Sequence, residues 1–489
     1  MPLTLCRFIF SVVSVFKNME PIRKVKIVCT IGPATSSINV IEKMIKAGMD
    51  VARLNFSHGT HEEHKRAIQN IRQASRKYDA PVALLQDLKG LKIRVGAIKD
   101  GSTVLKKGSA LTITTKNITG DSKRISVSYR DLIRDVETGD NILLDDGLIQ
   151  LKVTGREKDR VITKVIEGGI LKEKKGVNLP ATKISGIVFT KKDREDLEFG
   201  IKMGIDYAAM SFVRSGQDIL RVKNWLKKKN ADIPVIAKIE NRQALDNIDE
   251  IIAAADGLMV ARGDLGVELP PENVPLLQKD LIERCNAAMK PVITATQMLE
   301  SMTEHVTPTR AEAADVANAV LDGTDALMLS AETSVGRHPV EALKMMDRII
   351  RYTEMRKPQS NGADVVSRGF AQALAESACS SAMDIKAKTI VAFSRSGFTA
   401  LLVSKFRPGV PVTGFTVSEE VRRRMNLFWG VRPYVMKFPD NTDEMISESE
   451  KALLQKGIVR KGDSIAIIAS SPFALGGKTN IMKLHKVGY

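Results

Sequence analysis

The chain has 489 residues, 43% of them hydrophobic and 27% charged, a balance typical of globular proteins and not of disordered or membrane proteins. One compact core cannot accommodate this length, so we expect roughly two to four domains. The formal net charge of +17 suits a polyanionic ligand, but aromatic residues make up only 5% of the chain. With few platforms for base stacking and no arginine-rich tail, a dedicated nucleic-acid-binding protein is disfavoured.

The cysteines indicate a reducing compartment. Cys6, Cys29, Cys285 and Cys379 include no pair at C-x-x-C spacing. Neither a disulfide framework nor a zinc site is therefore predicted, and we expect reduced thiols in a cytoplasmic protein.

A short apolar run, 8–16, stands near the N-terminus and resembles the hydrophobic part of a weak signal segment. It is too short to span a bilayer, and no small-residue cleavage motif follows it. We expect residues 1–19 to be an extension outside the fold, with translation starting at Met19, in preference to a targeting segment. No membrane partner is expected.

Apolar β-branched runs alternate with amphipathic helix patterns along two stretches, 20–90 and 189–352. Continuous apolar runs are typical of parallel strands that are buried on both faces. Helical patterns lie between them, for example at 38–47 and 309–321. Eight such units predict an α/β fold, a closed (β/α)₈ TIM barrel with its active site at the carboxyl ends of the strands. The predicted strands are 25–31, 50–56, 82–87, 205–212, 234–239, 257–261, 291–296 and 325–329.

The alternation breaks between residues 91 and 188. Segments such as 110–115, 141–144 and 150–154 are β-rich and are separated by Gly-, Asp- and Asn-containing turns. This stretch predicts a small β-barrel domain inserted after the third barrel strand. An insertion there lies over the barrel mouth, where it can act as a lid.

A third pattern extends over residues 353–489 and predicts a smaller α/β domain with a parallel sheet. Its first part, 357–363, contains Pro, Ser and Gly and is typical of a linker. The predicted strands are 389–393, 411–415 and 464–469, and the predicted helices are 367–384, 397–406 and 441–455.

Polar side chains collect where the barrel strands end, so they should meet at one rim of an apolar barrel. Glu240 and Asp264 follow neighbouring strands, and two carboxylates are what Mg²⁺ needs from a protein when substrate and water complete its shell. Lys238 lies on the same face of its strand as Glu240, where an ammonium can neutralise a transferring phosphoryl group or an enolate. A Lys-x-Glu or a Gly-Asp pair by itself is more often a salt bridge or a turn. The convergence of five strand ends with compatible chemistry favours a catalytic site instead.

Several long runs resemble the pyruvate kinase family. They are KIVCTIGPAT at 26–35, VARLNFSHGT at 51–60, IAKIEN at 236–241, MVARGDLGVELP at 259–270, PVITATQMLESM at 291–302 and DALMLSAET at 325–333. The resemblance covers nearly the whole chain from Lys24 and includes the three-domain layout. It implies transfer of the phosphoryl group of phosphoenolpyruvate to ADP, giving pyruvate and ATP, with Mg²⁺ or alternatively Mn²⁺ as cofactor.

The resemblance also implies roles for single residues. Arg53 would bind the transferred phosphoryl group, and Lys238 would stabilise its charge. The substrate carboxylate would be bound around Gly263 and Asp264 with Thr296, and either Thr296 or a water would protonate the enolate. Glu240 and Asp264 would hold the metal, and the nucleotide would be bound by Asn55, His58, Arg94 and Lys175.

One departure concerns the monovalent cation. Many family members bind K⁺ through groups that match Asn55, Ser57, Asp87 and the carbonyl of Leu88, with Thr and Glu where this chain has Leu88 and Lys92. The Leu/Lys pair resembles the K⁺-independent type, since the Lys92 ammonium is itself a fixed cation. We expect activity without added K⁺; the alternative is that Lys92 is solvated and the pocket still takes K⁺.

In the C-terminal domain a loop with hydroxyls and a glycine opens a predicted helix, which suits a phosphate. The loop, which resembles the family's effector-phosphate loop, comprises Ser394, Arg395, Ser396, Gly397 and Thr399. A phosphorylated allosteric effector is one reading and an ordinary glycine turn the other. The segment 470–480 could close over the loop. The family is usually a homotetramer, which we carry over as an expectation.

Two other functions remain as alternatives. A metal-dependent C–C lyase of the phosphoenolpyruvate/pyruvate type would share the acidic metal site, but it would not need the inserted lid or Arg94 and Lys175. A basic nucleic-acid-binding protein would show salt-sensitive RNA binding without turnover. A coupled assay with phosphoenolpyruvate, ADP and Mg²⁺ separates all three.

Overall fold

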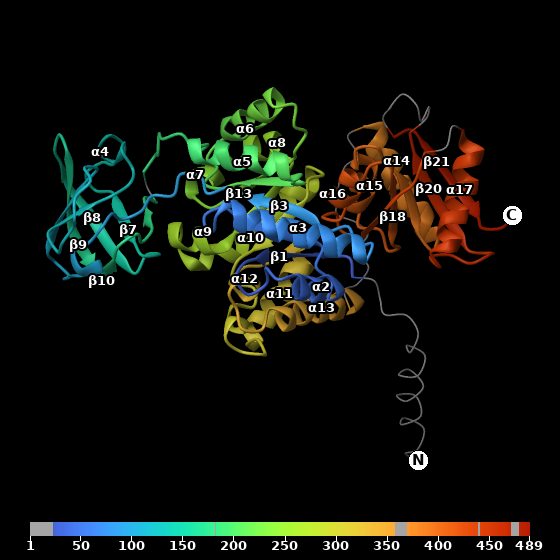
Figure 1. Cartoon of the computed structure of the whole chain (residues 1–489). Coiled ribbons are helices and arrows are strands. Elements are labelled where there is room, and N and C mark those ends of the chain that lie inside the picture. The colour runs from blue at the N-terminus through green and yellow to red at the C-terminus, as the bar shows by residue number, and fades with distance from the viewer. Residues whose placement is uncertain (1–22, 181, 357–368, 439–440, 471–478) are drawn as a thin grey trace, which may run out of the picture.

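The computed structural model describes residues 23–180, 182–356, 369–438, 441–470 and 479–489. The predicted extension 1–19 and linker 357–363 lie outside these residues, as does most of the segment 470–480. Figure 1 shows three parts in a row, with the barrel between an all-β part and a C-terminal α/β part.

Eight parallel strands close into a barrel, as the sequence predicted, in the order β1-β16-β15-β14-β13-β12-β3-β2. Nearly every strand residue is buried, because helices cover the outside and side chains fill the interior. The strands are β1 (Lys26–Ile31), β2 (Val51–Asn55), β3 (Ala83–Asp87), β12 (Tyr207–Met210), β13 (Val235–Ile239), β14 (Gly257–Ala261), β15 (Val292–Ala295) and β16 (Ala326–Leu329).

Capping residues determine where several barrel helices begin. Thr60, Thr190 and Thr309 each accept a hydrogen bond from the third helical residue, whose carboxylate reaches back to the cap. The main helices are α2 (Ile38–Lys46), α3 (His61–Lys77), α5 (Lys191–Met203), α6 (Gly216–Lys228), α8 (Ile248–Ala254), α10 (Val274–Ala287), α11 (Arg310–Asp322) and α13 (Pro339–Arg356). Short helices α7 (Arg242–Asp246), α9 (Arg262–Glu268) and α12 (Ala331–Ser334) follow strands directly at the rim.

The predicted insertion is all-β apart from short helical turns, including α4 (Leu132–Asp135). Its strands form a six-stranded sheet in the order β11-β7-β8-β9-β5-β6 and a two-stranded sheet of β10 and β4, around one apolar core. The strands are β4 (Ser102–Leu105), β5 (Ala110–Thr114), β6 (Arg124–Ser126), β7 (Asn141–Leu144), β8 (Ile149–Arg156), β9 (Arg160–Glu167), β10 (Gly169–Lys172) and β11 (Val177–Asn178).

The C-terminal part is an α/β sheet in the order β19-β18-β17-β20-β21. The prediction of a wholly parallel sheet was wrong at one edge, because β21 pairs antiparallel with β20. The sequence also missed β19, β21 and α16. The elements are β17 (Ile390–Phe393), β18 (Val412–Thr416), β19 (Val431–Val435), β20 (Ser464–Ala469) and β21 (Ile481–Lys486), with α14 (Phe370–Asp384), α15 (Phe398–Lys405), α16 (Glu419–Met425) and α17 (Thr442–Gln455).

The barrel and the C-terminal sheet share one apolar core. A single cluster of buried side chains runs from the barrel interior, including Met259, to Met425 at the end of α16 and Phe428 just after it. Next to it Lys405 forms a buried ion pair with Asp325, which directly precedes β16. The C-terminal part therefore covers the end of the barrel opposite the inserted part (Figure 1). Within the described parts of the chain, none of the helices has the length and apolar character needed to cross a bilayer.

Candidate active site

Lys238 lies at the centre of the polar rim, at the end of β13, with only 8% of its surface exposed. Its Nζ is 2.7 Å from Glu240 Oε1 and 3.2 Å from Asp87 Oδ1, and it donates a hydrogen bond of 2.7 Å to Ser211 Oγ. Burial acts to lower the pKa of Lys238, but the two carboxylates outweigh it and hold the pKa above its ordinary value. The rim thus keeps a buried, permanently charged ammonium.

Arg53 contributes a second buried cation beside the first. Its Nε donates to Asp87 Oδ2 at 2.8 Å and its Nη1 donates to Thr30 Oγ1 at 2.9 Å. The strand register brings Arg53 to Thr30, because Thr30 in β1 pairs with Arg53 in β2. Burial acts to raise the pKa of Asp87, yet Lys238 and Arg53 hold it below its ordinary value. Asp87 therefore stays ionised and bridges the two cations.

Glu240 and Asp264 form the acidic side of the rim. Glu240 is 2% exposed, and its second oxygen, Oε2, accepts the backbone N–H of Phe212 at 2.7 Å. Burial raises the pKa of Glu240 to about 7, with the Lys238 ammonium opposing the rise and the Asp264 carboxylate adding to it. The Asp264 carboxylate makes no hydrogen bond or ion pair with any described residue, and Asp264 lines the adjacent cavity.

These two carboxylates fit a divalent cation. Among the described residues, no group of three or more His, Cys, Asp and Glu side chains could hold a metal by itself. A hard ion such as Mg²⁺ does not need one, because it takes one or two carboxylates and fills its other positions with substrate oxygens and water. The Asp264 carboxylate, which has no protein donor, is available for that purpose.

Thr296 and Gly263 meet beside Asp264, where β15 and β14 end. Gly263 N–H donates to Thr296 Oγ1 at 2.8 Å, and Arg262 holds the carbonyl of Thr296 at 2.7 Å. Thr296 and Gln297 both have a positive φ, 68° and 53°, which turns the chain sharply where β15 ends. Such strain in two non-glycine residues is typical of a functional site.

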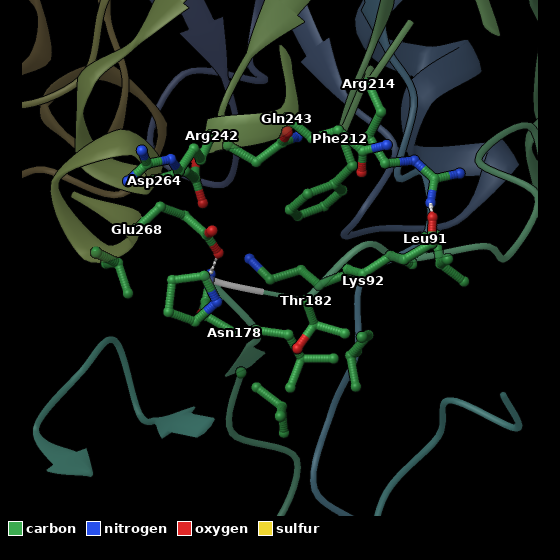
Figure 2. A pocket seen from close by; sticks show the side chains of 18 of the residues that line it. Leu91, Lys92, Asn178, Thr182, Phe212, Arg214, Arg242, Gln243, Asp264 and Glu268 are labelled. Carbon is green, nitrogen blue, oxygen red and sulfur yellow. Dashed lines mark hydrogen bonds between the residues drawn. The ribbon is translucent and has the colours of Figure 1, made fainter. Parts of the chain in front are cut away.

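A cavity of about 520 Å³ lies between this rim and the inserted part. Barrel residues such as Phe212, Arg242 and Asp264 line one side, and Asn178 and Thr182 of the inserted part line the other. Figure 2 shows Asn178 meeting Glu268 across the cavity, where Asn178 Nδ2 donates to Glu268 Oε1 at 3.0 Å. Asp264 thus lines a cavity that is covered by the insertion.

The predicted nucleotide residues divide between barrel and insertion. His58 follows β2, and its pKa is lowered by partial burial and by cations that include Arg94 and Lys92. Arg94 donates to the carbonyl of Lys174 at 2.8 Å, and Lys175 Nζ is 2.7 Å from Asp145 Oδ1. The side chains of Arg94 and Lys175 are therefore each held by a partner within the inserted part.

The residues of the expected K⁺ pocket are engaged by protein groups. Asn55 Oδ1 accepts the Ser57 N–H at 3.1 Å, and the Leu88 carbonyl accepts Ser211 Oγ at 2.7 Å. Asp87 is held by Arg53 and Lys238 as described above. Lys92 makes no ion pair with any described residue, and Figure 2 shows its side chain directed into the cavity, toward Asn178 and Glu268.

The loop from Ser394 to Thr399 opens α15 in the C-terminal part, as expected. Thr399 N–H donates to Ser394 Oγ at 3.2 Å, and Phe398 N–H donates to Ser396 Oγ at 3.4 Å. Gly397 has φ +89°. Serine hydroxyls thus already occupy two of the helix N–H groups, and Arg395 stacks on Phe438 with 5.3 Å between the guanidinium and the ring.

Sequence reasoning missed three residues of the rim, namely Thr30, Ser211 and Phe212. Thr30 and Ser211 carry hydroxyls that accept hydrogen bonds from Arg53 and Lys238, and Phe212, at φ 55°, donates its N–H to Glu240. Only their position along the chain could have indicated these residues, because Thr30 and Ser211 lie at strand ends, as the predicted residues do.

Comparison with known proteins agrees with this geometry. The family model described as the pyruvate kinase barrel domain matches residues 22–343, and the pyruvate kinase alpha/beta domain matches residues 372–485. The chain belongs to the pyruvate kinase family. A pyruvate kinase of Staphylococcus aureus is 47% identical over 472 residues, covering 95% of this chain and 81% of the relative. One of Geobacillus stearothermophilus is 48% identical over 472 residues, covering 95% and 80%.

A solved structure of a pyruvate kinase from Cryptosporidium parvum has a TM-score of 0.89 and 37% identity, covering 95% of this chain and 96% of that one. The chain is therefore a phosphotransferase of this family, which transfers the phosphoryl group of phosphoenolpyruvate to ADP and yields pyruvate and ATP. The lyase and nucleic-acid alternatives are not needed.

Proposed function

We propose that Lys238 stands where the phosphoryl group passes from phosphoenolpyruvate to ADP. The observation that supports this role is the buried ammonium held between Asp87, Ser211 and Glu240. A fixed cation in a site shielded from water stabilises developing negative charge without reorganising. Arg53 is a second such cation, and we assign it to the phosphoryl oxygens.

The remaining rim residues orient the substrate. The carboxylate of phosphoenolpyruvate would lie against Thr296 and the backbone around Gly263, at the start of α9. Transfer of the phosphoryl group leaves an enolate, whose charge Lys238 also offsets. A proton must then reach the enolate carbon, delivered by Thr296 or by a water.

We assign Glu240 and Asp264 to a divalent metal, Mg²⁺ or alternatively Mn²⁺. When bound there, such an ion supplies positive charge to substrate oxygens. The free carboxylate of Asp264 at the cavity wall supports this assignment. Asn55, His58, Arg94 and Lys175 would bind ADP between barrel and insertion, with the insertion excluding water.

We further propose that the enzyme needs no K⁺. Lys92 is a cation without a partner among the described residues, and it lies close enough to His58 to lower the pKa of that imidazole. Its charge would take the place of the monovalent ion. Activity measured with and without K⁺, in buffer free of Na⁺, should be the same; a tenfold or greater activation by K⁺ would refute the proposal.

Three further properties follow from the family resemblance as proposals. A phosphorylated effector would bind at the loop Ser394–Thr399, through serine hydroxyls and the Arg395 guanidinium. The active assembly would be a homotetramer. A cytoplasmic location is supported by Cys29, Cys285 and Cys379, which are all buried and free.

A coupled assay with phosphoenolpyruvate, ADP and Mg²⁺ tests the assigned roles. Lys238→Met removes the ammonium and keeps the length of the side chain, so kcat should fall by about a hundredfold or more. Circular dichroism should show an intact fold, because Arg53 still balances Asp87. Near-full turnover of the folded variant would show that Lys238 does not have this role.

A further inference from the structure

The end of β2 and the turn after it carry two of the proposed nucleotide residues, Asn55 and His58. Backbone bonds tie its start to the rim, since Phe56 N–H donates to the Asp87 carbonyl at 2.9 Å and His58 N–H donates to the Asn55 carbonyl at 3.2 Å. Gly59 then leaves the turn with φ +77°. The turn has few fixed points after Phe56, because residues 58–60 are exposed.

One buried side chain reaches over this turn. His64 Nε2 lies 2.9 Å from the carbonyl oxygen of His58. The carbonyl has no proton to give, so the imidazole must be the donor. The same ring lies flat on Phe56, with ring centroids 4.1 Å apart and an interplanar angle of 12°. His64 therefore holds both the buried start of the turn and its exposed tip.

The fold presets His64 for this contact. Thr60 and Glu63 form a capping box that starts α3 directly after the turn, which places His64 in the first turn of the helix. Only 8% of His64 is exposed, and burial lowers its pKa, so the ring is neutral at physiological pH. A neutral ring bonded through Nε2–H has one tautomer and one orientation.

Several cations lie within electrostatic reach of the tip of the turn. Arg94, Lys92, Arg53 and Lys89 all lie near enough to the His58 imidazole to lower its pKa. A shift of this turn would therefore move His58 relative to the position of the nucleotide phosphates. It would leave Lys238 and Glu240, which belong to β13 and its end, unchanged.

We propose that His64 is a positioning residue for the nucleotide: its Nε2–H on the His58 carbonyl and its stacking on Phe56 hold the turn in the conformation that receives ADP. This inference rests on the proposed nucleotide role of His58. It predicts that substitution of His64 raises the KM for ADP and leaves the KM for phosphoenolpyruvate nearly unchanged.

Three substitutions separate the hydrogen bond from the stack. His64→Phe keeps a flat ring on Phe56 and removes the donor, so the KM for ADP should rise about fivefold, the loss expected for one hydrogen bond. The KM for phosphoenolpyruvate and kcat should stay within twofold. His64→Gln restores an N–H at a similar reach and should return the KM for ADP to within twofold of the parent. His64→Ala should have the largest effect.

His61 supplies a matched control on the same helix. It stacks on Phe199 at 4.3 Å and pairs with Asp196 at 2.7 Å, and it meets Phe56 only as a tilted ring with centroids 6.1 Å apart, without a hydrogen bond to the described residues of the turn. His61→Gln should leave both KM values unchanged. If His64 had only a structural role, its substitution would lower Tm without raising the KM for ADP relative to the KM for phosphoenolpyruvate.

Two outcomes would overturn the inference, and they are distinguishable from failure of the nucleotide assignment. If His58→Ala raises the KM for ADP while His64→Phe does not, the assignment holds and the positioning role is wrong. If His64→Phe raises both KM values equally, the effect is not specific for the turn. If His58→Ala leaves the KM for ADP unchanged, the nucleotide role of His58 itself fails.

Discussion

Lys238 is held by partners from three different strands. Asp87 ends β3, Ser211 follows β12, and Glu240 follows β13, the strand that carries Lys238. Ser211 is the neutral member, and it is 4% exposed. Its hydroxyl accepts the Lys238 N–H and donates to the Leu88 carbonyl at 2.7 Å, so it fixes the ammonium without adding charge.

Ser211→Ala should therefore lower kcat by about tenfold, the cost of one hydrogen bond to a charged group. Substrate KM values should change little, because no substrate contact is lost. Steady-state kinetics in the coupled assay measures both values. Ser404→Ala is the matched control, since Ser404 is also buried and bonds a carbonyl, that of Trp429 at 2.7 Å. Equal effects of the two variants on kcat would contradict the prediction.

At the scale of elements, the insertion and the barrel touch through β11 and α9. Asn178 is in β11, and Glu268 is the last residue of α9, the helix that carries Asp264 in its first turn. The hydrogen bond therefore ties the inserted part to the helix that carries Asp264, the carboxylate that we assign to the metal. The contact is charge-assisted, which makes it stronger than a neutral hydrogen bond.

Asn178→Asp should open the insertion, because it replaces the donor with a second carboxylate facing Glu268. The KM for ADP should rise about tenfold, and limited proteolysis between barrel and insertion should be faster. In the double variant Asn178→Asp with Glu268→Gln, the KM for ADP and the rate of proteolysis should return toward the parent values, because the glutamine amide then donates to the aspartate. If the double variant is no better than the single one, the contact does not control closure.

At the scale of the whole molecule, one core joins the barrel to the C-terminal sheet, and a buried charge cluster stands beside it. Asp325 pairs with Lys405, which is fully buried, and with Arg407 at 2.9 Å. Lys405 also donates to Asn286 Oδ1 at 2.8 Å. Burial lowers the pKa of Lys405 to about 8, with Asp325 opposing the fall, so the amine remains mostly charged at neutral pH.

Lys405→Met should destabilise the protein by about 3 kcal/mol, because it leaves buried Asp325 with less compensation. Urea unfolding at a constant protein concentration measures this value. Lys451→Met is the control: Lys451 is 63% exposed, its ion pair to Glu448 is 3.8 Å long, and its loss should cost less than about 1 kcal/mol. Separate unfolding of the two parts in the parent protein would contradict the shared core.

Sequence patterns predicted the elements whose burial is uniform. All eight barrel strands were found, because each is an apolar run buried on both faces. The missed strands lack that signal, since Pro433 interrupts β19 and β21 is a partly exposed edge with polar residues. Helix α16 was missed because it has seven residues, five of them charged.

The sequence by itself determined the barrel, the order of its parts and the polar residues that reach one rim, because these depend on periodicity and on where strands stop. Only the tertiary structure decided which of those residues touch. Ser211 meets Lys238, Asn178 meets Glu268 and His64 meets His58 through strand register and the placement of an insertion. Such contacts depend on geometry between distant segments, which no local pattern of residues encodes.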